Sequence, residues 1–217
     1  SGIYTVHYQI AAAGNCPLMD ATYTVTIAGP PSGPSNVTYC VNEEKTVNDL
    51  TSAMTGSDIK WYSAVSGGSP YNGTDLLVTG SYYASQTIGG IESISRAEVA
   101  VTINAAGTWI GETSTDWHTA SNWCGGVPTA STVVVINSGG NQPVINVGST
   151  AECQSLTINT GAIVTNNGTL TIGTGLSGAG EFLNGEFAIL NIGGDATIAT
   201  RTATAEDNTA YYNGAAQ

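Results

Sequence analysis

The chain has 217 residues, of which 16 are acidic and 4 basic, giving a formal net charge of −12. Four scattered cations cannot form the basic patch that nucleic acids or anionic lipids require, and no apolar run approaches the roughly 20 residues of a membrane span. Charged residues make up only 9% of the chain against 41% hydrophobic, and there are 28 glycines. This composition indicates an extracellular β-protein with many turns and a neutral polar surface.

Two alternating runs near the N-terminus, residues 3–8 and 21–27, predict β-strands. Two strands alone are marginal in water. We therefore expect residues 1–28 to be either the last hairpin of a preceding domain or a hairpin that packs on the next segment of the chain. Residues 29–35, rich in Pro and Gly, predict a short stiff linker. The chain opens within a strand pattern, so we expect it to be a piece of a longer polypeptide whose export signal lies outside it.

Residues 36–104 predict one small β-sandwich. Trp61 lies in the middle of a predicted strand, where a sandwich commonly buries an aromatic side chain. One helical turn is plausible at residues 47–54. The strands expected in this segment are residues 36–41, 58–63, 75–78, 80–86 and 94–103.

Three tryptophans occur within residues 107–132, and a short repeat comes after them. The repeat places Leu-Thr-Ile or Leu-Asn-Ile at residues 156–158, 170–172 and 190–192. Short apolar rungs at this spacing predict a β-solenoid, in which stacking builds the core that no rung forms alone. An irregular β-sandwich remains the alternative, and residues 201–217 are either a further rung or a frayed end.

The segment around Tyr39-Cys40, Trp61-Tyr62 and Glu92-Ser93 resembles the immunoglobulin-like repeats of large Bacteroidetes cell-surface proteins. Those proteins are exported by the type IX secretion system and include the gliding-motility adhesins. In that family a Cys usually precedes Glu-Ser and pairs with the early Cys. Here Ile91 stands at that position, so the usual disulfide is expected to be absent.

Residues 107–200 are also similar to segments of such proteins, in which Trp-x-Gly, Asp-Trp and Asn-Trp precede a Leu-Thr-Ile solenoid. The matching residues are Trp109-Ile110-Gly111, Asp116-Trp117, Asn122-Trp123 and Leu156-Thr157-Ile158. The resemblance implies an all-β chain with four parts. These are a hairpin (1–28), a linker (29–35), an immunoglobulin-like sandwich (36–104) and a Trp-motif and solenoid region (107–217).

The four cysteines form no Cys-x-x-Cys pair, which argues against a zinc site. In an exported protein we expect disulfides. Cys124 and Cys153 flank the segment that joins the tryptophans to the first rung, and we predict a bond between them. We expect Cys16 to pair with a cysteine upstream of this chain. The alternatives, that Cys16 and Cys40 pair with each other or that both are unpaired, stay open.

The three tryptophans are the predicted ligand site. Trp109, Trp117 and Trp123 could form a platform on which sugars stack, and the alternative is that they pack to seal the junction between the sandwich and the solenoid. No catalytic residues are expected, because His118 beside Asp116 is typical of a surface turn. No cofactor is expected either, although Ca²⁺ remains an option, with Asp195, Glu206 and Asp207 as weak candidate ligands.

These patterns and the resemblance lead us to expect a non-enzymatic structural or adhesive segment of a long bacterial surface protein. Its partners would be flanking repeats of the same polypeptide, an extracellular polysaccharide or solid surface, and the outer-membrane secretion and motility machinery. The alternative is a carbohydrate-binding module attached to an exported polysaccharide-degrading enzyme. Exposed tryptophans would favour that alternative, and buried ones would argue against it.

Overall fold

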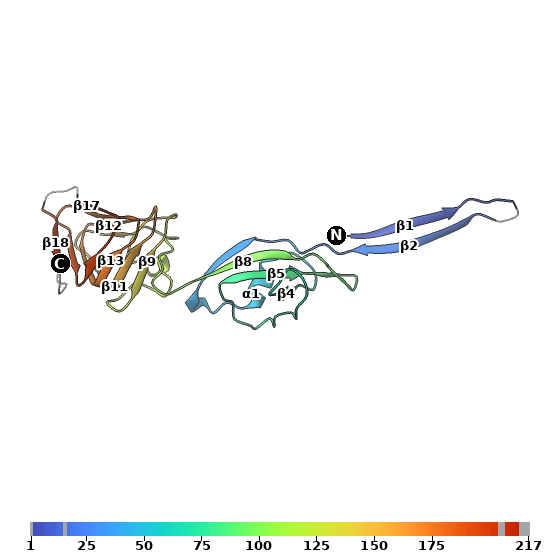
Figure 1. Ribbon diagram of the computed structural model, residues 1–217, viewed down its shortest axis with the longest axis horizontal. Helices are drawn as coiled ribbons and strands as arrows, with labels where there is room; N and C mark the ends of the chain where they lie inside the picture. The colour runs from blue at the N-terminus through green and yellow to red at the C-terminus, as the bar shows by residue number, and fades with distance from the viewer. Residues whose placement is uncertain (1, 15–16, 204–206, 213–217) are drawn as a thin grey trace. The chain divides into compact units, whose positions relative to one another are not determined.

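The computed structural model describes residues 2–14, 17–203 and 207–212. The chain is all-β and divides into two compact units. The first comprises residues 1–39 and 44–103, and the second comprises residues 40–43 and 104–217. The parallel strands of the second unit are stacked side by side in Figure 1. Cys16 and Glu206 lie outside the described residues.

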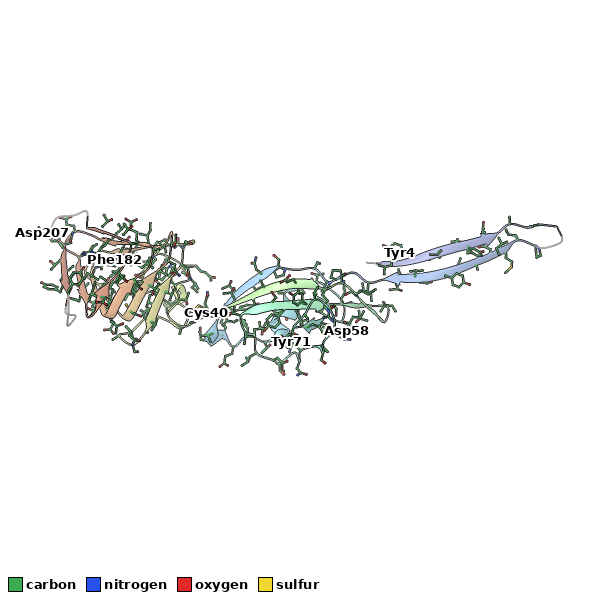
Figure 2. All side chains as sticks on the ribbon, viewed as in Figure 1. Tyr4, Cys40, Asp58, Tyr71, Phe182 and Asp207 are labelled. Atoms are coloured by element: carbon green, nitrogen blue, oxygen red, sulfur yellow. A yellow bond between two sulfur atoms is a disulfide. The ribbon has the colours of Figure 1, made fainter. Side chains whose placement is uncertain are left out.

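The chain begins with an antiparallel hairpin of β1 (Gly2–Ile10) and β2 (Met19–Ile27). Side chains alternate between the two faces of a strand, and residues opposite each other share a face. One face is polar, with Thr5 opposite Thr24. The other face is apolar and exposed, with Tyr4 opposite Val25 and further pairs along the strands, and Tyr4 is labelled in Figure 2. The hairpin is therefore amphipathic, as the alternating sequence implies.

The rest of the first unit is built on a four-stranded sheet in the order β3-β8-β5-β4, with a separate β6-β7 pair. The bounds are β3 (Asn36–Cys40), α1 (Val47–Ser52), β4 (Lys60–Tyr62), β5 (Gly80–Ser85), β6 (Thr87–Ile88), β7 (Ile91–Glu92) and β8 (Ala97–Asn104). Between β3 and α1 lies η1 (Val41–Glu43), which is grouped with the second unit. The predicted helical turn is confirmed as α1. This six-residue helix is the one α-helix in the part of the chain that the structure describes, and no helix there could span a bilayer.

The core of this sheet is covered mainly by α1 and a loop. Leu50 of α1 and Leu77 join the buried side chains of β4, β5 and β8. Residues 75–78, predicted as a strand, form no strand of their own, because Leu76 makes only an isolated bridge to Thr46. The predicted burial of Trp61 is confirmed, and its Nε1 donates a hydrogen bond to Thr51 Oγ1 at 2.9 Å.

Glu92 lies at the centre of a polar cluster beside this sheet. Its Oε1 accepts hydrogen bonds from Ser85 Oγ at 2.6 Å and Tyr62 OH at 2.7 Å, and its Oε2 accepts one from Lys60 Nζ at 3.3 Å. These hydrogen bonds favour the ionised form and lower the pKa of Glu92 to about 2. The Glu-Ser position that carries the family resemblance thus holds several strands together.

The second unit contains a β-solenoid, so the sequence prediction is confirmed. All its strand pairs are parallel. One sheet consists of β9 (Val133–Ile136), β11 (Thr150–Ile158), β13 (Thr169–Ser177), β15 (Ile189–Ile192) and β18 (Thr209–Tyr212), with β16 (Asp195–Ala196) beside β13. The other consists of β10 (Val144–Ile145), β12 (Ile163–Asn166), β14 (Glu181–Asn184) and β17 (Thr200–Ala203). The tail therefore contributes a further rung through β17 and β18.

The repeat found in the sequence forms the interior of the solenoid. Leu170 lies opposite Leu190 and Ile172 opposite Ile192 in adjacent strands, and all four are fully buried. Phe182 of β14 is also buried and is labelled in Figure 2. The first copy is out of register with the second, because Leu156 lies opposite Leu176 while Ala151 and Cys153 lie opposite Leu170 and Ile172. All of these side chains are buried in one cluster, so the apolar core still runs continuously along the stack.

Two buried asparagines, Asn166 and Asn184, form hydrogen bonds at one corner of this stack. Asn166 donates from Nδ2 to Asn184 Oδ1 at 2.8 Å and to the carbonyl of Ile189 at 3.0 Å. Asn184 donates to the carbonyl of Ala188 at 3.3 Å, and the N–H of Gly168 donates to Asn166 Oδ1 at 3.2 Å. Buried amides are normally hydrogen-bonded. These hydrogen bonds hold the backbone in place where the rungs of Asn166 and Asn184 turn from one sheet to the other.

Candidate functional site

The three predicted tryptophans form one buried cluster. The rings of Trp109 and Trp123 lie 4.8 Å apart at 80°, and those of Trp117 and Trp123 lie 4.7 Å apart at 69°. Their exposed fractions are 4%, 0% and 3% for Trp109, Trp117 and Trp123. Such edge-to-face contacts are favourable aromatic geometry, but they leave no ring face open for a sugar. The structure thus favours the packing alternative over the stacking platform.

Hydrogen bonds fix this cluster against the first rung. Trp123 Nε1 donates to the carbonyl of Trp117 at 2.6 Å, and Trp109 Nε1 donates to the carbonyl of Asn141 at 2.7 Å. The buried Asn122 accepts the backbone N–H groups of Thr113 and Ser114 through its Oδ1. The tryptophan segment therefore closes one end of the solenoid core above β9 and β10.

His118 lies in the turn that the sequence predicted. Its Nε2 is 2.9 Å from the carbonyl oxygen of Thr150, and its Nδ1 is 3.8 Å from Asp116 Oδ1. The Asp116 carboxylate also accepts the backbone N–H of His118 at 3.2 Å. These contacts account for the Asp-Trp-His sequence as local turn structure.

The predicted disulfide partner of Cys124 is wrong. Cys124 is bonded to Cys40, 84 residues away in sequence, and Cys153 is a free, buried thiol. Cys153 lies in β11 facing the core, where burial raises the pKa of its thiol to about 12. A thiol of that pKa does not ionise near neutral pH, so it is a poor nucleophile for exchange. A disulfide is typical of an oxidising compartment.

Of the weak calcium candidates, the structure describes Asp195 and Asp207. Asp195 lies exposed in β16, and Asp207 lies in a turn with a positive φ. Within residues 2–14, 17–203 and 207–212, no group of three or more His, Cys, Asp or Glu side chains is arranged to hold a metal ion.

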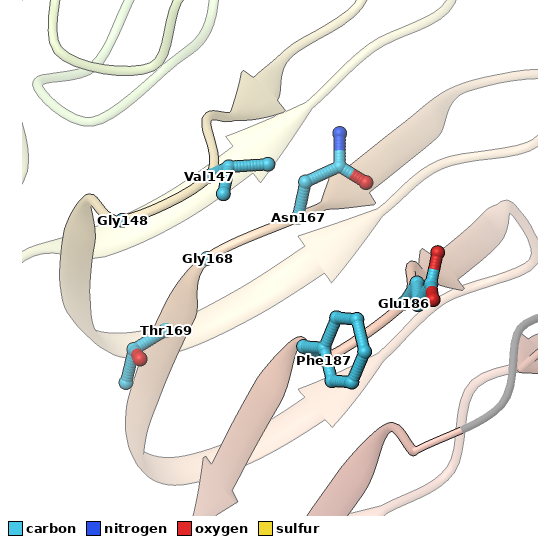
Figure 3. Close-up of a pocket in the computed structure, with 7 residues that line it drawn as sticks. All are labelled: Val147, Gly148, Asn167, Gly168, Thr169, Glu186 and Phe187. Atoms are coloured by element: carbon cyan, nitrogen blue, oxygen red, sulfur yellow. The ribbon is translucent and has the colours of Figure 1, made fainter.

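A groove that the sequence analysis did not anticipate runs across one corner of the solenoid. Its volume is about 460 Å³. The corner contains four residues in one rung (146–149), two in the next (167–168) and four in the third (185–188), as the strand registers show. The short middle corner is recessed between two longer ones. The lining residues, drawn in Figure 3, are Val147, Gly148, Asn167, Gly168, Thr169, Glu186 and Phe187.

The floor of the groove is tightly packed. Gly168 is buried, and a Cβ at this position would overlap the carbonyl oxygens of Ser149 and Asn146 in the neighbouring corner. The Asn167 side chain is half-buried, and its amide group makes no hydrogen bond to the part of the chain that the structure describes. The floor therefore offers one amide donor and acceptor to whatever occupies the groove.

The walls of the groove are apolar and exposed. Val147 is 84% exposed on one side and Phe187 is 67% exposed on the other. Both longer corners are turns closed by a backbone hydrogen bond between their first and fourth residues. The third residue of each turn has a positive φ, and it is Gly148 in one turn (φ 77°) and Phe187 in the other (φ 57°).

Phe187 is thus an aromatic residue where the turn geometry calls for Gly or Asn. The left-handed conformation costs a residue with a side chain about 1–2 kcal/mol. Strain of this kind concentrates at functional sites, and exposure of the ring means that core packing does not require it. A Phe in a Glu-Phe-Ala sequence gives no sign of this, because only the rung register shows that it replaces a turn glycine.

Comparison with protein families gives one match. A family model described as a domain of unknown function (DUF8693) matches residues 108–193. The match covers the tryptophan segment and the solenoid through β15, and the groove lies within it. Comparisons with curated proteins and with solved structures found no match.

Proposed function

We propose that this chain is a non-enzymatic structural and adhesive segment of a long, multidomain protein on the bacterial cell surface, where it acts in attachment or gliding motility. The observation that carries the proposal is the bond between Cys40 and Cys124. It gives the chain a covalent path that suits a connector under tension.

The bond closes a loop that contains α1 and β4–β8. Tension applied before residue 40 and after residue 124 passes through the two sulfur atoms. Residues 41–123 lie off this path, so tension does not extend that part of the chain. The disulfide therefore limits the length to which the chain can be stretched, which is useful in a connector of a surface protein.

Other features support the same proposal. The net charge of −12 and the near absence of cations keep like surfaces apart. The apolar face of hairpin β1–β2 supports a flanking β-unit as a partner, because a one-sided antiparallel sheet normally packs that face on a core. The resemblance to exported adhesins and the disulfide support an extracellular location.

The test is force extension of the full chain held at its two ends. With the disulfide intact, the fully stretched chain should be shorter by the enclosed loop. For a sequence separation of 84 residues this is about 290 Å. Adding reductant, or substituting Cys40→Ser, should release that length.

The matched control is Cys153→Ala, which removes a thiol outside the bond and should leave the stretched length unchanged. If the oxidised and reduced chains reach the same length, tension does not bypass residues 41–123, and the proposed role as a connector loses its main support.

A carbohydrate-binding module is the second candidate function. The observation that favours it is the groove walled by Val147 and Phe187, and not the tryptophans from which the sequence predicted it.

A further inference from the structure

We infer that the groove at residues 147–148, 167–169 and 186–187 binds a neutral polysaccharide, with a sugar ring stacked on Phe187. This inference deepens the surface-contact role proposed above and rests on it. It assigns that contact to residues that neither the sequence pattern nor the family match indicates.

The width of the groove limits its occupant. Adjacent rungs are spaced by about 4.8 Å, so walls on the first and third rungs are about 10 Å apart with one rung between them. An α-helix with its side chains is 10–12 Å across and would not enter. A single extended polymer chain fits this width.

The backbone at the floor argues against an added peptide strand. The N–H of Asn167 donates to the carbonyl of Ile145, and the N–H of Gly168 donates to Asn166 Oδ1. The carbonyl of Gly168 accepts the N–H of Ile189. Strand addition depends on free main-chain donors and acceptors, and this corner has already used both of its N–H groups and the Gly168 carbonyl within the solenoid.

The charge around the groove argues against an anionic ligand. Residues 133–200 contain no Lys or Arg, while Glu186 places a carboxylate at the groove. The Glu186 carboxylate would repel an anionic ligand, and no Lys or Arg of residues 133–200 could pair with its charge. A neutral ligand with many hydroxyl groups is not repelled by this carboxylate.

The lining groups match a sugar in kind. The exposed face of Phe187 suits the apolar C–H face of a pyranose ring, as aromatic faces suit other apolar surfaces. The Asn167 amide can donate to and accept from hydroxyl groups, and the Glu186 carboxylate can accept from them. Figure 3 shows Asn167 between the corner that carries Val147 and the corner that carries Glu186 and Phe187. A few polar groups beside apolar walls are the usual composition of a ligand site.

The test uses affinity electrophoresis of the full chain through gels containing xylan, glucomannan or dextran, with alginate and chitosan as charged counter-probes. We expect retardation by at least one neutral polysaccharide. Phe187→Gly should weaken that binding about tenfold, and Val147→Asn on the opposite wall should weaken it less.

The substitution Phe187→Gly separates binding from folding. It introduces the residue that Gly148 already provides at the equivalent turn position, so the variant should fold at least as stably as the native chain. Phe187→Tyr keeps the ring and should retain binding. Tyr211→Ala, which removes an exposed aromatic of β18, should change nothing.

Absence of retardation by all three neutral polysaccharides would overturn the inference, as would retardation that Phe187→Gly leaves intact. Binding only to alginate or only to chitosan would overturn the neutral class of ligand. The force experiment does not involve Phe187, so its outcome tests the connector role separately.

Discussion

The Glu92 carboxylate is held by hydroxyl and ammonium donors from two strands, and this makes the first unit sensitive to acid. Folding lowers its pKa from 4.5 to about 2, chiefly through the hydrogen bonds from Ser85 and Tyr62. The folded state therefore binds this proton less tightly than the unfolded state. The resulting stability is complete above about pH 4.5 and is lost as the pH falls toward about 2.

We therefore expect Glu92→Gln to destabilise the first unit at pH 7 and to make almost no difference near pH 2. Calorimetric unfolding of both chains between pH 7 and pH 2 measures this. Glu152→Gln, which alters an exposed carboxylate of the solenoid, is the control. Parallel pH profiles for the native chain and Glu92→Gln would show that the hydrogen bonds to Glu92 contribute nothing.

Residue roles were predicted unevenly from the sequence. The burial of Trp61 follows from its place in the middle of a strand, and it is confirmed. The groove could not be predicted, because Phe187 gains its position from the lengths of three corners that are distant in sequence. Exposure and a positive φ are properties of the folded corner, and no local pattern encodes them.

Among the elements, the tryptophan cluster closes the end of the solenoid that begins with β9. Trp117 is fully buried, and its Nε1 has no hydrogen-bond partner among the described residues. Trp117→Ala removes a large side chain from a packed core, and such changes cost about 3–5 kcal/mol. We expect that loss in urea unfolding of the second unit.

Trp117→Phe is the informative companion. It keeps most of the buried ring and removes the unpaired N–H, whose burial is unfavourable, so its loss should be clearly smaller. Equal losses for Phe and Ala would mean that the indole ring as such is needed, and no loss for either would mean that the cluster does not cap the core.

The solenoid was predictable as an element because its repeat lies in local sequence. Leu and Ile at alternate positions fix which side chains face inward. The recurrence predicts the pairing of residues 170–172 with 190–192, but not that of Leu156, which lies opposite Leu176. The second layer of the first unit was less predictable. Residues 75–78 have strand-like composition, but α1 and Leu77 cover the sheet there, so tertiary packing overrides local propensity.

At the scale of the whole molecule, the Cys40–Cys124 bond joins segments far apart in sequence. Cys40 takes its partner from the tryptophan segment. Closing a loop of this length stabilises by about 4–5 kcal/mol in the chain-entropy model. Sequence separation gave no guide to this pairing, because Cys40 and Cys124 come together only in the folded second unit.

Cys40→Ser and Cys124→Ser should each lower the unfolding free energy by up to that amount, and the double variant should lose no more than either one. Denaturant unfolding with and without reductant measures this. Cys153→Ala should keep the full dependence on reductant. If instead Cys40→Ser retains that dependence and Cys153→Ala abolishes it, the bond joins Cys124 to Cys153.

The position of this bond also determines what proteases that cleave after basic residues can do to the chain. Lys45, Lys60 and Arg96 all lie inside the loop closed by Cys40 and Cys124, and Arg201 is the one basic residue outside it. Cleavage after all three enclosed residues still leaves the piece that carries the hairpin bonded to the piece that carries the groove. A chain nicked once inside the loop therefore stays one covalent molecule until it meets a reductant, whereas cleavage at all three sites frees residues 46–60 and 61–96 from any covalent link.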